Sequence, residues 1–146
     1  MQELKNPEAA ESAHVLIKTI LFYGGIMFLI GFAFGVAREL VFIPLAGKRA
    51  GHWVEFPMML AATAWMAQIT SSRLREATTG TLLALGMFGT AVMLLIESGF
   101  ALYVLRLPPK DYLAGFDVTK GELFPWGLAF MALAPLAMNR FWIKTQ

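Results

Sequence analysis

The sequence predicts an all-α, polytopic membrane protein with four transmembrane helices, built as two parallel helical-hairpin repeats. Composition is the first reason. Of the 146 residues, 58% are hydrophobic and only 15% are charged, whereas about a quarter of the residues of a soluble domain are charged. The second reason is a repeat, because residues 31–64 match residues 99–132 without gaps at thirteen of thirty-four positions. Chance would give about three or four identities. The length fits a single domain.

The first fourteen residues are polar, and the single transmembrane domain is expected to occupy residues 15–146. Residues 1–14 are interpreted as a short tail or an interfacial helix. A cleaved signal peptide is the alternative, because Gly35-Val36-Ala37 could serve as a small-residue cleavage site. The apolar stretch of residues 20–37 is too long for the hydrophobic part of a signal peptide, and the tail is net acidic. We therefore favour a tail that stays attached.

The first repeat covers about residues 15–73 and begins with a long apolar helix. This helix is predicted from about Val15 to beyond Arg38, which is long enough to cross a hydrocarbon core of about 30 Å. Gly31 and Gly35 form a small-xxx-small pair on the same helical stripe as Arg38. Such a pair lets a neighbouring backbone approach closely, so these glycines are predicted to lie at a helix interface.

The second predicted helix follows a loop rich in Pro, Gly and basic residues. It is expected to start near Glu55 and to continue to Ile69. Pro57 would then lie in its first turn, where a missing N–H costs little. Glu55 would lie at the positive end of the helix dipole.

The second repeat covers about residues 80–141. Its first helix is predicted over residues 81–105, with Glu97 as the one charge inside it, and with Gly86 and Gly89 as further packing positions. A long loop over residues 106–121 follows.

The last predicted helix runs from Leu123 to about Asn139. Pro125 lies in its first turn, and Pro135 lies deep inside it and is expected to kink it. Four spans place both termini on one side of the membrane. The counts of Lys and Arg on the two sides are equal, but the shortest loop is basic, so we place both termini in the cytoplasm.

Four charged residues inside or beside the predicted spans need a physical explanation: Arg38, Glu55, Glu97 and Arg106. A charge at the bilayer centre costs about 2.5–3.5 kcal/mol, so unpaired charges are disfavoured. We expect Arg38 to pair with Glu55 near the loop-side surface. Counted from Arg106, Glu97 lies about 13 Å deeper, near the midplane. Glu97 is therefore a candidate for ion binding or for contact with another subunit. The alternative for Arg38 and Arg106 is that they only extend to the membrane surface.

No residue pattern points to catalysis, a cofactor or a metal. The chain has no cysteine, and its two histidines, His14 and His52, are expected on opposite sides of the membrane. No Gly-rich phosphate loop, nucleophile elbow or pair of zinc-binding histidines is present in the sequence. The net charge of +2 comes from scattered loop residues, so nucleic acid is not an expected partner.

One loose motif resembles a known group of proteins. The pattern G-F-x-x-G-x-x-R, followed by P, G, R and then E-F-P-M-M, is formed by Gly31, Gly35, Arg38, Pro44, Gly47, Arg49, Glu55 and Pro57. It is similar to the pattern of small four-span proteins of the bacterial inner membrane. The resemblance covers most of the chain. It implies a bacterial membrane protein and implies no activity.

The sequence leaves two functions of different class open. The first, narrowly favoured, is a non-catalytic accessory or assembly subunit of a larger membrane complex, because the chain is small and has no reactive residue cluster. The second is a small oligomeric transporter or channel for protons, cations or a small solute, with Glu97 in the pathway. Expected partners are the lipid bilayer and either other membrane subunits or further copies of the chain. An intramembrane enzyme is the weakest possibility.

Overall fold

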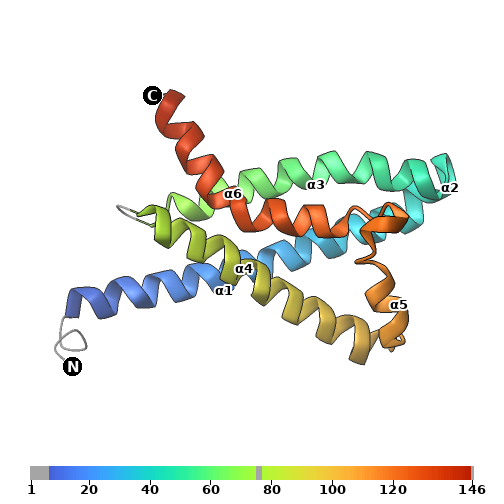
Figure 1. Cartoon of the computed structure of the whole chain (residues 1–146), viewed down its shortest axis with the longest axis horizontal. Coiled ribbons are helices and arrows are strands. Elements are labelled where there is room, and N and C mark those ends of the chain that lie inside the picture. Colours follow the sequence, from blue (N-terminus) through green and yellow to red (C-terminus); the bar gives the residue numbers. More distant parts are fainter. Residues whose placement is uncertain (1–6, 75–76, 146) are drawn as a thin grey trace.

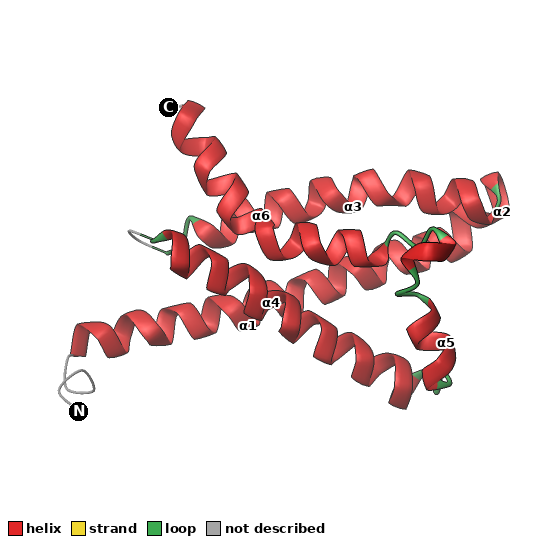
Figure 2. Ribbon diagram, in the orientation of Figure 1, coloured by secondary structure: helices red, strands yellow, loops and turns green. Residues whose placement is uncertain are grey.

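The computed structural model describes residues 7–74 and 77–145, and all regular secondary structure in these residues is helical (Figure 2). The all-α prediction is therefore confirmed. Helices η2 and η3 are π-helical and η4 is 3₁₀-helical. In chain order the elements are α1 (Pro7–Ala37), η2 (Arg38–Phe42), α2 (Ile43–Ala46), α3 (Lys48–Ser71), α4 (Thr79–Gly99), η3 (Phe100–Val104), α5 (Pro109–Ala114), η4 (Val118–Lys120) and α6 (Phe124–Thr145).

The four long helices form an open bundle. Helices α1 and α4 run in one direction, and α3 and α6 run in the other (Figure 1). Helix α1 packs against α4 and α3, and α6 also packs against α4 and α3. The start of α1 and the end of α6 lie at one end of the bundle, and α2 and α5 lie at the other (Figure 1). Helices α1 and α4 cross and then diverge toward the α2/α5 end.

Two segments are long and apolar enough to cross a membrane, judged by length and composition. They are Pro7–Ala46 and Thr79–Val104, and they correspond, with different end residues, to the first and third spans predicted from the sequence. Helices α3 and α6 have 24 and 22 residues, or about 36 and 33 Å, but they are less apolar. Among the described residues, the structure thus supports two candidate spans.

Glycines bring the helices closest together where α1, α4 and α6 meet. A Cβ atom on Gly24 of α1 would lie 2.6 Å from the carbonyl oxygen of Gly89 on α4. A Cβ on Gly89 would lie 2.5 Å from the ring of Tyr23, and a Cβ on Gly86 would overlap the backbone carbonyl of Ala132 on α6. The prediction that Gly86 and Gly89 are packing positions agrees with these contacts.

The same prediction is wrong for Gly31 and Gly35. A Cβ on Gly35 would meet nothing within 4 Å, and a Cβ on Gly31 would only touch the end of the Met93 side chain at 3.9 Å. Both glycines lie beyond the crossing point, where α1 and α4 have diverged, and they line a cavity instead. Their spacing suits a helix interface, but the crossing lies about two turns nearer the N-terminus of α1, at Gly24.

A proline in α6 explains a hydrogen bond between distant helices. Helix α6 bends midway along its length (Figure 1), and Pro135 lies in this middle part by sequence position, as predicted. Proline lacks the N–H that would donate to the carbonyl four residues earlier, which here belongs to Met131. The hydroxyl of Tyr23, a residue with 0% exposure, donates to the Met131 oxygen at 3.0 Å. Tyr23 thereby satisfies the carbonyl that Pro135 leaves free.

Removing the Tyr23 hydroxyl should destabilise the fold strongly only when residue 135 is proline. We expect Tyr23→Phe to lower the free energy of unfolding by about 2 kcal/mol, because a buried carbonyl loses its partner. In a Pro135→Ala background the new N–H can bond to Met131, and the same substitution should cost clearly less. Unfolding of the four proteins in mixed detergent, followed by circular dichroism, measures this difference. Equal costs in both backgrounds would disprove the link between Tyr23 and Pro135.

The first hairpin turns more tightly than the sequence predicts. Helix α3 begins at Lys48, not near Glu55, and the turn from α2 to α3 is made at Gly47 with φ = 84° and ψ = 163°. This region of backbone space is essentially restricted to glycine. Gly51 then lets α3 pack on Ile43, whose Cγ1 would be 3.2 Å from an added Cβ. The predicted loop is therefore mostly helix, and Glu55 lies two turns inside α3 rather than at its positive end.

Other predicted boundaries also change. Residues 7–14, predicted as a tail or an interfacial helix, form the first part of α1, and residues 1–6 lie outside the described residues. Pro57 lies inside α3, not in its first turn. The predicted loop of residues 106–121 contains α5 and η4, and α6 continues from the predicted end at Asn139 to Thr145. Short helices and helix ends carry too little apolar periodicity to be found by pattern.

Candidate functional site

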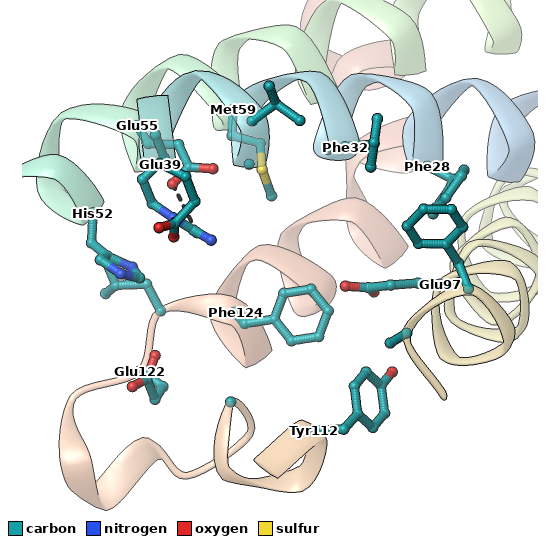
Figure 3. Close-up of a pocket in the computed structure, with 18 of the residues that line it drawn as sticks. Phe28, Phe32, Glu39, His52, Glu55, Met59, Glu97, Tyr112, Glu122 and Phe124 are labelled. Carbon is teal, nitrogen blue, oxygen red and sulfur yellow. Dashed lines mark hydrogen bonds and ion pairs between the residues drawn. The ribbon is translucent and has the colours of Figure 1, made fainter. Parts of the chain in front are cut away.

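A cavity of about 730 Å³ lies at the α2/α5 end of the bundle, where α1 and α4 have diverged (Figure 3). Its lining comes from α1, η2, α3, α4, η3, α5, the start of α6 and the chain segments beside them. A volume of about 300–1,000 Å³ is typical of sites for small organic molecules. This cavity is therefore the main candidate site in the described part of the chain.

Two aromatic clusters form much of the cavity wall. In the first, the ring of Phe100 from η3 contacts two rings of α1, Phe28 at 5.7 Å and Phe32 at 5.3 Å between centroids, both edge-on. In the second, Phe116 contacts Tyr112 of α5 at 5.5 Å and Phe124 of α6 at 5.0 Å. Edge-to-face contacts of this kind hold the rings in defined orientations. All six rings line the cavity.

A partly buried ion pair lines one side of the cavity. The Arg38 Nη1 atom lies 3.1 Å from Oε2 of Glu55, and its Nε atom lies 3.4 Å from Oε1 of Glu39. Glu55 is 6% exposed, while the Glu39 side chain is 61% exposed. The predicted pair between Arg38 and Glu55 is thus present. Arg38 occupies the first position of the π-helical segment η2, a kind of distortion that is frequent at functional sites.

Glu97 has a buried carboxyl oxygen without a protein partner among the described residues. It lies in α4, three residues before η3, and its Oε2 atom is buried with no hydrogen-bond partner within residues 7–74 and 77–145. Figure 3 shows its carboxyl group directed into the cavity, toward the ring of Phe124. Buried polar atoms are nearly always satisfied in folded proteins. The Glu97 carboxyl group, which lines the cavity and has one unsatisfied oxygen, therefore marks the place where a ligand group would gain most.

A hydrogen bond beside Glu97 connects α5 to α4. The hydroxyls of Ser98 and Tyr112 are 2.8 Å apart, so the short helix α5 is fixed to the helix that carries Glu97. The ring of Tyr112 also packs edge-on against the ring of Phe116. Through these contacts, α5 forms a wall of the cavity rather than a separate loop.

Arg106 does not repeat the role of Arg38. The repeat aligns the two arginines, but Arg106 follows η3 with φ = 53° and is exposed. It forms no ion pair with any residue that the structure describes, and it does not line the cavity. The expected network of four charged residues therefore reduces to the Arg38–Glu55 pair and Glu97, which share one cavity.

The sequence reasoning missed the aromatic walls and three acidic residues at the cavity: Glu39, Asp111 and Glu122. One signal was available, because Phe32 and Phe100 are identical under the repeat offset of sixty-eight. No comparable signal existed for Tyr112 or Phe116, which lie in a stretch that the sequence suggests is loop.

The cavity offers no metal site of the usual kind. Within the described ranges, no group of three or more His, Asp or Glu side chains is arranged to hold a metal ion. Among the cavity's charged residues, five are acidic and one is an arginine. The chain matches no protein-family model, no curated protein and no solved structure. Any functional conclusion therefore depends on the geometry of the site.

Proposed function

We propose that this chain is a four-span protein of the bacterial inner membrane that acts as a small oligomeric carrier, taking a small solute into the cavity beside Glu97 and moving it across the bilayer. The observation that carries the proposal is the unpartnered, buried Glu97 oxygen at a partly enclosed cavity of about 730 Å³. A charge inside a membrane segment is costly and usually functional. A cavity of this size has room for a solute, not only for a proton.

The arrangement of the helices supports the proposed repeat. The most extensive contacts between long helices are the two hairpins, α1 with α3 and α4 with α6, and two further pairs, α1 with α4 and α3 with α6; α3 and α4 also touch. A two-fold axis along the membrane normal would produce this set of neighbours. The rings of Phe32 and Phe100, equivalent under the repeat, touch each other, as equivalent residues do near such an axis.

The exposed surface supports the placement of all four helices in lipid. Each long helix exposes large apolar side chains, among them Leu29, Trp65, Leu95 and Leu133. Monomeric soluble proteins rarely expose apolar area on this scale. In this proposal both termini lie in the cytoplasm, because the turn between α3 and α4 is short and basic. Copies of the chain would associate through the exposed apolar faces, since four helices enclose little space alone.

Efflux from proteoliposomes tests the carrier proposal without assuming the charge of the solute. The purified chain is reconstituted around labelled mannitol, benzenesulfonate or tetraethylammonium. We expect at least one probe to leave faster than from protein-free liposomes, with saturation. Glu97→Gln should lower that flux about tenfold or more, because a contact to a charged group is lost. The matched control Glu11→Gln changes an exposed residue of α1 outside the cavity and should leave the flux unchanged.

Two outcomes would contradict the proposal. One is that no probe leaves faster than it does without protein. The other is that the Glu97→Gln protein carries every probe at the wild-type rate, which would mean that this carboxyl group has no part in the pathway.

The second candidate is the accessory or assembly subunit. The same exposed apolar side chains favour it, because a larger membrane complex could cover them in place of lipid. Affinity purification from native membranes in mild detergent separates the two candidates. Recovery of the chain alone, at one discrete size, would exclude the accessory role and leave the carrier.

A further inference from the structure

We propose that the ligand of this cavity is a monovalent organic cation with apolar substituents, whose charged group is placed between the Glu97 carboxylate and the faces of the surrounding aromatic rings. This inference rests on the proposed function and names the class of solute. It depends on three features of the described residues: the charge of the lining, the partner that Glu97 lacks, and the aromatic walls.

The charge of the cavity disfavours an anionic ligand. Five acidic residues line it, against the one guanidinium of Arg38. That guanidinium is already shared between Glu39 and Glu55, at 3.4 and 3.1 Å. An anion would therefore be repelled by the excess of negative charge, and the guanidinium of Arg38 would not be free to bind it. A cation would be attracted. The acidic residues are Glu39, Glu55, Glu97, Asp111 and Glu122.

The unsatisfied oxygen of Glu97 favours a cationic ligand over a purely apolar one. A hydrocarbon in the cavity would leave the buried Oε2 atom without a partner, and an unpartnered buried polar group costs about 1–3 kcal/mol. A cationic group beside it removes this cost. The ligand should therefore have its charge at the level of Glu97 and its apolar groups against the rest of the wall.

The aromatic walls and the volume favour an organic cation over a metal ion. Ca²⁺ or Mg²⁺ needs about six oxygen ligands at short distance, and no group of three metal-binding side chains is present in the described chain. In the view of Figure 3, the Glu97 carboxyl group points toward the ring of Phe124, with Phe28 and Phe32 above it and Tyr112 below. The faces of aromatic rings attract organic cations that have lost part of their hydration shell. Each well-placed ring contributes about 0.5–2 kcal/mol to the binding free energy.

Two probes of nearly the same shape and opposite charge test this inference. Tetraphenylphosphonium and tetraphenylborate are titrated by equilibrium dialysis into the purified chain in neutral detergent, with empty micelles as the blank. We expect saturable binding of tetraphenylphosphonium only. Glu97→Gln should weaken it about tenfold or more, and Glu97→Asp, which keeps the charge, should retain most of it. Glu11→Gln serves as the matched control for the loss of one negative charge.

The aromatic contribution needs its own matched pair. Phe124→Leu should weaken tetraphenylphosphonium binding about threefold or more, and Phe124→Tyr, which keeps the ring, should restore it. Phe88→Leu removes an exposed ring of α4 that does not line the cavity, and it should have no effect. Circular dichroism of each variant checks that the helices are intact.

The outcomes separate this inference from the function on which it rests. Equal binding of both probes, or tetraphenylphosphonium binding that survives Glu97→Gln unchanged, would overturn the cation assignment. So would efflux of mannitol or benzenesulfonate in preference to tetraethylammonium, although the carrier proposal would then stand. If no probe binds and none leaves the proteoliposomes, the carrier proposal fails together with the inference.

Discussion

A Gly86→Ala variant is expected to be the most destabilised single substitution at the helix crossing. The added Cβ would overlap the backbone carbonyl of Ala132, three residues before Pro135 in α6. A backbone carbonyl cannot rotate away as a side chain can, so α4 and α6 must separate. We expect a loss of about 3 kcal/mol in the free energy of unfolding, at the upper end of what overpacking costs. Unfolding in mixed detergent, followed by circular dichroism, measures it.

The matched control for Gly86→Ala is the same substitution at Gly35. No atom lies within 4 Å of the Cβ position there, and alanine is favoured over glycine in a helix by about 0.5–1 kcal/mol. Gly35→Ala should therefore leave the protein equally stable or slightly more stable. Equal destabilisation by both substitutions would mean that α1 uses Gly35 for packing after all, and that the crossing point lies elsewhere.

These two glycines illustrate which part of the fold can be predicted from the sequence. The apolar composition and the length of the apolar segments are enough to predict long helices. The spacing of Gly31 and Gly35 predicts a helix face able to pack closely, but spacing does not say where along the helix a partner crosses. That position depends on the direction of α4 relative to α1, which is a property of the whole bundle and is not encoded within one helix.

The candidate site was predictable in part for a similar reason. A charge within an apolar segment is visible in the sequence because of its cost, so Arg38, Glu55 and Glu97 could be singled out. The rings that surround Glu97 could not, because a phenylalanine in an apolar helix is indistinguishable from one that faces lipid. Tyr112 and Phe116 come from a stretch with Pro, Gly and Asp, where a six-residue helix leaves no periodic signal.

The ion pair between η2 and α3 gives the second large effect that we expect. Arg38→Met should lower the free energy of unfolding by about 3 kcal/mol, because Glu55, 6% exposed, would keep a buried carboxylate without its cation. The expected loss is at the lower end of the range for broken buried pairs, since 28% of the Arg38 side chain is exposed. The same unfolding experiment measures the loss.

A second substitution separates the loss of the pair from the loss of the arginine itself. Adding Glu55→Gln to Arg38→Met removes the unpaired charge and should recover most of the lost stability, because a neutral amide costs much less to bury than a carboxylate. Arg106→Met, at the aligned but exposed position, should change stability by no more than about 0.5 kcal/mol. If both arginines only extended to the membrane surface, the two Met variants would behave alike and Glu55→Gln would restore nothing. A difference between them would mean that Arg38 stabilises the fold through its pair with Glu55, whereas Arg106, at the aligned position, has no comparable role.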